Sequence, residues 1–263
     1  MTETVQLEYR SQGEGTPLLV LHGLFGSGSN WGRQAARLAA DGYQVILADL
    51  RNHGRSPHHA DLHYPTMAAD VLALLDRLRL DSALVLGHSM GGKVAMTLAL
   101  EHGHRVRGLI VADVAPVTYE GDSHESLIEA LQSVDLAALA SRQAAFDQLA
   151  ERIPEAGIRH FLLTNLEQRD GAWQWRVPLQ RLRDGLPILR GFPAVADRNY
   201  PGPTLFLHGG DSDYLRAEHT SEVRKLFPDS HIVSLPECGH WLHVEDPDGF
   251  HAAVKQFLDS RIG

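Results

Sequence analysis

A serine flanked by two glycines carries the clearest chemical signal in this sequence. The run Gly87-His88-Ser89-Met90-Gly91 fits the pattern G-x-S-x-G, which is typical of a nucleophile elbow. An apolar run at 83–86 predicts a buried strand before it, and apolar residues at helical spacing follow from Val94. So tight a strand-to-helix turn strains the serine backbone and leaves no room for side chains two residues away. We therefore interpret Ser89 as a nucleophile at a helix N-terminus, where the dipole favours negative charge, rather than as a solvated serine.

A serine hydroxyl is a weak nucleophile, and it needs an imidazole to accept its proton and a carboxylate to orient that imidazole. His240, in the loop 237–241 after the last predicted strand, is the candidate base. Asp113 and Asp213 each follow a predicted strand, and either could supply the carboxylate. Two ionised carboxylates beside one imidazole repel each other, so we expect one of them to point away. Ser212 is a candidate for a supporting hydrogen bond in the same network.

Backbone N–H groups must stabilise the oxyanion that forms when a nucleophile attacks an acyl group. Met90 directly follows the candidate nucleophile and offers one N–H by its position. We expect the second N–H from Leu24 or Phe25, in the glycine-rich loop 22–27. The side chains of these two residues can also line an acyl pocket, and the two roles are compatible.

Strand and helix patterns alternate along most of the chain and predict the scaffold that positions these residues. Apolar runs typical of buried strands lie at 17–21, 44–48, 83–86, 108–112, 203–207 and 230–235, with an edge strand at 5–10. Helical patterns lie at 31–40, 64–80, 218–227 and 248–258, besides the helix after Ser89. This alternation predicts an α/β fold with a mostly parallel, doubly wound sheet. Candidate residues would gather at the carboxyl ends of its strands.

The alternation stops between residues 118 and 200. Helical patterns at 126–139, 143–153 and 157–166 follow one another without a central strand, and 173–175 resembles a short extended piece. We interpret 118–200 as a helical cap that is inserted before the last two strands and lies over the carboxyl edge of the sheet. The core would then comprise residues 1–117 and 201–263.

The composition suits one α/β domain of a soluble enzyme, because 43% of the 263 residues are hydrophobic and the net charge is −9. An acidic balance argues against nucleic acid or an anionic membrane as the main partner.

The N-terminus has no signal-peptide pattern, and no apolar run is long enough for insertion into a membrane, which favours the cytoplasm. Cys238 is the single cysteine and cannot form an internal disulfide. The histidines at 58, 59 and 63 lack a metal-ligand pattern, so we expect no metal and no other cofactor.

Five runs occur in order along the chain: His22-Gly23-Leu24-Phe25-Gly26-Ser27, Asp49-Leu50-Arg51-Asn52-His53-Gly54-Arg55-Ser56-Pro57, Gly87-His88-Ser89-Met90-Gly91-Gly92-Lys93, Asp113-Val114-Ala115-Pro116-Val117 and Gly239-His240-Trp241-Leu242-His243. Together they resemble the α/β-hydrolase superfamily, and within it the small bacterial carboxylesterases related to animal mitochondrial α/β-hydrolase-domain proteins. The resemblance implies hydrolysis of carboxylic esters of small to medium acyl chains. It also favours Asp113 as the acid, because in that group the position of Asp213 is generally not acidic.

Three alternatives stay open at this point. The same residues could hydrolyse acyl thioesters such as acyl-CoA, with Arg51 or Arg55 binding a phosphate of CoA. An arginine after this strand more often ties its loop down by hydrogen bonds. The protein could instead be a non-catalytic homologue that binds a ligand. The complete set of candidate catalytic residues argues against this alternative. The oligomeric state is open between a monomer and a homodimer.

Overall fold

A parallel sheet forms the centre of the computed structural model, which describes residues 3–121, 123–195 and 198–262. Within them the main sheet has seven strands in the order β1-β3-β2-β4-β5-β8-β9. These strands are β1 (Tyr9–Gln12), β2 (Thr16–Leu21), β3 (Tyr43–Ala48), β4 (Ala83–His88), β5 (Val106–Ala112), β8 (Thr204–Gly209) and β9 (Ser230–Leu235). Only β1 runs antiparallel to its neighbour, β3, and the other pairs are parallel. The mostly parallel sheet expected from the sequence is confirmed.

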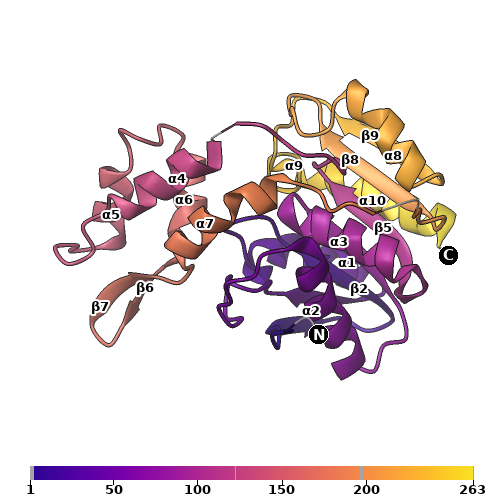
Figure 1. The fold of residues 1–263 in the computed structure, drawn as a ribbon, viewed down its shortest axis with the longest axis horizontal. Coiled ribbons are helices and arrows are strands. Elements are labelled where there is room, and N and C mark those ends of the chain that lie inside the picture. The colour runs from indigo at the N-terminus through magenta and orange to yellow at the C-terminus, as the bar shows by residue number, and fades with distance from the viewer. Residues whose placement is uncertain (1–2, 122, 196–197, 263) are drawn as a thin grey trace.

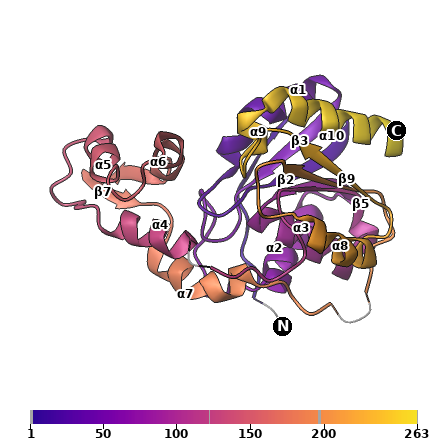
Figure 2. The same ribbon diagram turned by 90° about the horizontal axis from the view of Figure 1, so that it is seen from above.

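Helices cover both faces of this sheet (Figure 2). On one face lie α1 (Gly32–Ala40) and α10 (Pro247–Arg261), and on the other α2 (Tyr64–Arg77), α3 (Met90–Glu101) and α8 (Thr220–Leu226). Every residue of β4 is buried, and alternate side chains point to opposite faces. Leu84 and Leu86 therefore pack with α1 and α10, whereas Ala83 and Val85 join the core beneath α2 and α3.

Between β5 and β8 the chain forms a separate body beside the sheet (Figure 1). We call residues 118–200 the cap. The cap contains α4 (Ser123–Gln132), α5 (Arg142–Gln148), α6 (Ala156–Leu163), a hairpin of β6 (Leu166–Arg169) and β7 (Ala172–Trp175), and α7 (Leu179–Arg190). The insertion of helices before the last two strands agrees with the predicted fold class.

Several element bounds differ from the expected ones. The edge strand β1 spans Tyr9–Gln12 rather than 5–10. The first cap helix ends at Gln132 rather than at 139. The helix expected at 157–166 ends at Leu163, because Leu166 already belongs to the hairpin. The helix α7 has no counterpart among the expected elements, since Gly185 and Pro187 interrupt its helical pattern.

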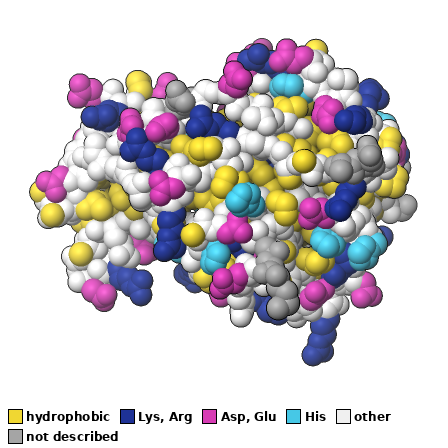
Figure 3. All heavy atoms as spheres, viewed as in Figure 1, with side chains coloured by type: hydrophobic (Ala, Val, Ile, Leu, Met, Phe, Trp, Pro, Cys, Tyr) yellow, Lys and Arg dark blue, Asp and Glu magenta, His cyan; other side chains and the backbone are white. Residues whose placement is uncertain are grey.

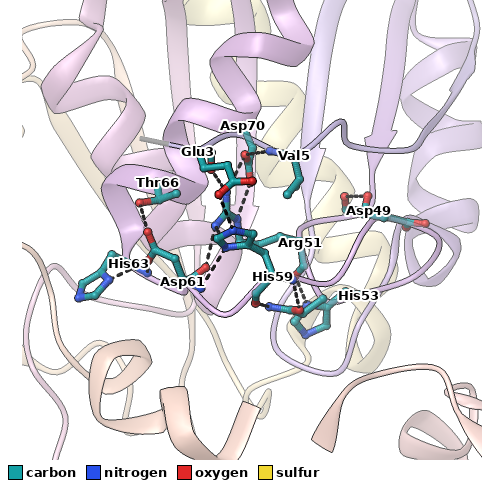
Figure 4. Close-up of polar contacts among 12 residues, drawn as sticks. Glu3, Val5, Asp49, Arg51, His53, His59, Asp61, His63, Thr66 and Asp70 are labelled. Carbon is teal, nitrogen blue, oxygen red and sulfur yellow. Dashed lines mark hydrogen bonds and ion pairs between the residues drawn. The ribbon is translucent and has the colours of Figure 1, made fainter. Parts of the chain in front are cut away.

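Arg51 anchors the loop after β3 and is 0% exposed (Figure 4). Its Nε and Nη2 donate to the two carboxylate oxygens of Asp70 on α2, at 2.6 and 2.8 Å. Its Nη1 donates to the backbone oxygen of Asp61 at 2.7 Å. With its donors already bound to protein acceptors, this guanidinium is not available to a CoA phosphate. The loop-tying role is the one that the contacts support.

Acidic and basic side chains are interspersed over the face of the molecule shown in Figure 3. Such a mixed surface forms no single-sign field on that face. None of the helices in the described residues has the length and apolarity needed to cross a membrane.

Candidate active site

Ser89 lies between β4 and α3 with a backbone φ of 52°, which is in the left-handed region. A Cβ atom at Gly87 would lie 2.2 Å from the Gly91 carbonyl oxygen, and one at Gly91 would lie 2.4 Å from that of Leu21. Only glycine fits at either position, which is the mechanical requirement of a nucleophile elbow. The Ser89 N–H donates to the Ala112 carbonyl at 2.9 Å, so the strained residue is tied to the end of β5.

Asp113 follows β5 and faces His240 across the carboxyl edge of the sheet. The Nδ1 atom of His240 lies 2.7 Å from Oδ2 of Asp113, whose side chain is fully buried. The same oxygen accepts the hydroxyl of Ser212 at 2.5 Å, and Oδ1 accepts the Gly209 N–H at 3.1 Å. This carboxylate is therefore held by three donors, and the Nδ1–H of His240 is one of them.

Asp213, the other candidate acid, lies outside this network. Its side chain is 84% exposed and forms an ion pair with Arg216 at 3.0 Å. The structure thus brings one of the two aspartates to His240 and leaves the other in solvent.

Two aromatic groups fix the ring and backbone of His240. The ring stacks on Tyr214, with centroids 4.1 Å apart and planes 24° from parallel. The backbone oxygen of His240 accepts Nε2–H of His88 at 2.8 Å. Burial lowers the pKa of His88 well below its usual value, so its imidazole stays neutral near pH 7. His88 therefore acts as a neutral donor that supports the loop of His240.

The loop after β2 forms a turn beside the elbow. Gly26 N–H donates to the Gly23 carbonyl at 3.0 Å, which closes the turn 23–26. Among the described residues, no protein acceptor receives the N–H of Leu24 or Phe25. Met90 is the first residue of α3, so its N–H has no acceptor in its own helix. Within the described ranges, the N–H groups of Leu24 and Phe25 therefore have no protein acceptor, and that of Met90 has none within its helix.

His22 braces this turn. Its Nδ1–H donates to the Gly23 carbonyl at 2.8 Å, and its Nε2 accepts the Leu50 N–H at 3.0 Å. Burial lowers the pKa of His22 to about 4, which keeps Nε2 unprotonated and able to accept. His22 is thus a structural histidine and not a second base.

Two cavities meet at Ser89. The larger holds about 620 Å³ and the smaller about 260 Å³, and Ser89, Leu24, His124 and Tyr214 line both. The smaller cavity is mainly apolar, and its walls include Leu127, Ile158, Phe161, Leu162, Trp31 and Trp241. The larger one has charges of both signs on its walls, from Lys93, Arg190, Arg216, Glu120, Asp213 and Glu218. A nucleophile between two compartments suits a substrate with two different arms.

Two further residues near the site were not among the candidates that the sequence analysis named for a role there. Lys93 is 2% exposed, and its ammonium donates to the carbonyls of Val117, Arg190 and Gly191 at 2.9, 2.8 and 2.6 Å. Burial lowers the pKa of Lys93 to about 7, and the three acceptors oppose loss of its proton. Asn165 of the cap contacts the turn 23–26. A lysine on the otherwise apolar helix after Ser89 could have drawn attention to Lys93.

No three side chains of His, Cys, Asp or Glu come together to hold a metal ion in the part of the chain that the structure describes. His58 contacts the Arg176 carbonyl. His59 contacts Glu3, and His63 contacts Asp61 (Figure 4). Each of these histidines therefore has a separate protein partner.

Comparison with known proteins shows which family the chain belongs to. A family model described as the alpha/beta hydrolase fold matches residues 16–247. The chain belongs to the α/β-hydrolase family. This α/β hydrolase is 40% identical over 256 residues to the sn-1-specific diacylglycerol lipase ABHD11 of Danio rerio, a match that covers 95% of this chain and 80% of that protein.

Bacterial proteins named as esterases are similar over most of the chain. The esterase YbfF of Escherichia coli K12 is 34% identical over 250 residues, which are 95% of this α/β hydrolase and 96% of YbfF. The solved structure of a marine microorganism esterase matches with a TM-score of 0.94 at 37% identity, over 97% of this chain and all (100%) of that one. The resemblance inferred from the five sequence runs is confirmed, since proteins named as esterases or as a diacylglycerol lipase match most of the chain.

Proposed function

We propose that this α/β hydrolase cleaves carboxylic esters of small to medium acyl chains through a triad of Ser89, His240 and Asp113. The observation that carries the proposal is the 2.7 Å contact between His240 Nδ1 and the buried Asp113 carboxylate, at the cavities that Ser89 lines. Ester-cleaving relatives, named esterases and a diacylglycerol lipase, agree with this chemistry.

The reaction would proceed in two halves. His240 accepts the proton of the Ser89 hydroxyl, and the serine oxygen attacks the ester carbonyl. The N–H of Met90 and that of Leu24 or Phe25 stabilise the oxyanion. His240 then passes its proton to the departing alcohol, which leaves an acyl-enzyme, and a water activated by His240 releases the acid.

Asp113 serves this cycle without reacting itself. Its Oδ2 holds the Nδ1–H tautomer of His240, so that Nε2 is the basic atom, and it stabilises the imidazolium that forms. Ser212 supports the carboxylate through its hydroxyl, at 2.5 Å from the same oxygen. Neither Asp113 nor Ser212 needs to move during the reaction, because Asp113 already contacts His240 and Ser212 already contacts Asp113.

The larger cavity favours an ester over a CoA thioester. A CoA carries several phosphate charges, and a site for it needs a surplus of cationic side chains. Here Glu120, Asp213 and Glu218 accompany the basic residues of the larger cavity, and Arg51 is already bound to Asp70. The apolar 260 Å³ cavity is of a size for a small or medium acyl group.

Initial rates on matched p-nitrophenyl esters and acyl-CoA thioesters of two to sixteen carbons test this proposal. We expect turnover of short and medium esters by the wild type and its loss in Ser89→Ala, because alanine has no nucleophilic oxygen. Ser260→Ala, in the last turn of α10, is the matched control and should keep full activity. Full activity of Ser89→Ala would rule out the mechanism, and a preference for acyl-CoA would make the protein a thioesterase.

A further inference from the structure

One side chain of the cap reaches the turn that is proposed to carry an oxyanion donor. Asn165 follows α6 in the cap (Figure 1) and is 3% exposed. Its Nδ2 donates to the carbonyl oxygens of Phe25 at 2.7 Å and of Leu162 at 3.2 Å. Both acceptors are carbonyl oxygens, so the nitrogen of the amide must be the atom that faces them. Asn165 thereby links α6 of the cap to the turn 23–26 of the core.

The residue that Asn165 holds has an unfavourable backbone conformation. Phe25 has a φ of 62°, a left-handed value that costs a bulky residue about 1–2 kcal/mol. The turn it belongs to is tightly packed on its other side, where a Cβ at Gly23 would lie 2.9 Å from Nδ1 of His88. The turn is therefore held between the elbow on one side and the Asn165 amide on the other.

We propose that Asn165 is a positioning residue for the oxyanion turn, so that the cap contributes to catalysis as well as to substrate selection. This inference rests on the proposed esterase function. A hydrogen bond to the Phe25 carbonyl orients that peptide, and in a four-residue turn this restricts where the N–H groups of Leu24 and Phe25 point. Donors that are already oriented stabilise an oxyanion most, because they need no reorganisation during the reaction.

The same part of the cap forms a wall of the smaller cavity. Ile158, Phe161 and Leu162 of α6 line it, and the Leu162 carbonyl is the second acceptor of Asn165. An acyl group that fills this cavity packs against α6 and stabilises the position from which Asn165 reaches Phe25. The oxyanion turn is then fully supported only while this part of the cap is docked on the core.

The test compares kcat and KM of the wild type, Asn165→Ala and Asn165→Ser on one short p-nitrophenyl ester. Removal of a direct oxyanion donor costs ~10²–10³ in kcat, and we expect a smaller loss of ~10–100-fold from this indirect contact. KM should stay within about threefold, and a trifluoromethyl ketone, which forms an oxyanion on the serine, should bind more weakly by the same factor as kcat falls. Thr164→Ala is the matched control, since its exposed hydroxyl donates within the cap, to the Phe161 carbonyl at 2.6 Å.

Circular dichroism and thermal unfolding establish the folded fraction of each variant. If Asn165→Ala does not fold, Asn165→Ser replaces it, because a serine side chain is also too short to reach Phe25. A raised KM with unchanged kcat would make Asn165 a wall residue and overturn the proposal. Unchanged kcat in both variants would overturn it as well. If the wild type itself hydrolyses no ester, the proposed function fails first, and Ser89→Ala measured in parallel separates the two results.

Discussion

Asp113 and Asp213 differ in what their carboxylates touch, and this difference decides which of them can orient an imidazole. Asp113 is buried and accepts three hydrogen bonds, one of them from His240. Asp213 is largely in solvent beside Arg216, where water screens its charge. A carboxylate stabilises a developing imidazolium effectively only when it is close and poorly solvated.

We expect Asp113→Asn to lower kcat by ~10⁴, the loss that accompanies the same change in a serine-protease triad. An asparagine amide at this place stabilises the wrong imidazole tautomer, so that Nε2 no longer accepts the serine proton. Asp213→Asn is the matched control and should change kcat by less than about twofold, because its contacts are exposed. Rates on one ester, corrected for folded protein, check both, and similar losses in the two variants would contradict the assignment.

The sequence singles out Ser89 and His240 because local patterns mark them, a G-x-S-x-G turn and a loop after the last strand. It could not choose between the two aspartates from spacing, because β5 and β8 are neighbours in the sheet and both residues follow their ends. Asp113 has a backbone φ of 51°, in the left-handed region, and its side chain contacts His240. No sequence pattern indicates this backbone conformation. Asn165 had no pattern at all, since its role depends on contact between distant segments.

At the scale of elements, Lys93 joins the helix of the elbow to the start of the cap and to the end of its last helix. It lies on α3 and donates to Val117, just before the cap, and to Arg190 and Gly191 at the C-terminal end of α7. The ring of Tyr119 lies 4.6 Å from its Nζ, a distance that favours a cation. The Arg190 carbonyl also accepts the Tyr119 N–H at 3.0 Å. Among the described residues, the carbonyls of Val117 and Gly191 have Lys93 as their donor.

We expect Lys93→Met to destabilise the protein by about 3 kcal/mol, because methionine fills much of the space but takes the ammonium donor away from the carbonyls of Val117 and Gly191. Urea-induced unfolding gives the free energy, and limited proteolysis reports whether the chain near Val117 and Gly191 becomes accessible. Lys225→Met is the control, since that side chain is 70% exposed. A loss no larger than in the control would show that Lys93 does not hold the cap.

The strands could be predicted well from sequence because their apolar runs are short, continuous and bounded by turn residues. The cap was less predictable, and α7 shows why. A Cβ at Gly185 would lie 2.3 Å from Leu62 Cδ1, so any larger residue would displace the Leu62 side chain, and glycine lets this cap helix pack closely on the core. Its low helix propensity hides the helix in the sequence, and tertiary packing compensates for it in the fold.

At the scale of the whole molecule, several imidazoles are buried near the carboxyl edge of the sheet. Burial lowers the pKa of His22 to about 4 and those of His53 and His243 to about 3, and it also lowers the pKa of His88. The unfolded chain exposes the same histidines to water, where their pKa is about 6.5. Below that pH the unfolded state therefore binds protons that the folded state does not.

This linkage predicts that the free energy of unfolding is level above about pH 7 and decreases as the pH falls from about 6.5 toward 4. At pH 5.5 each such histidine reduces stability by about 1.4 kcal/mol, so three of them together reduce it by about 4 kcal/mol. Urea unfolding at pH 7.5, 6.5 and 5.5 measures the slope. His53→Phe should reduce the loss at pH 5.5 by the share of one histidine, about 1.4 kcal/mol, because phenylalanine takes up no proton in the unfolded chain. His104→Phe at an exposed position controls for the added ring. A stability that stays level down to pH 5.5 would contradict neutral burial of these rings, and with it the view that imidazoles brace the site as uncharged groups.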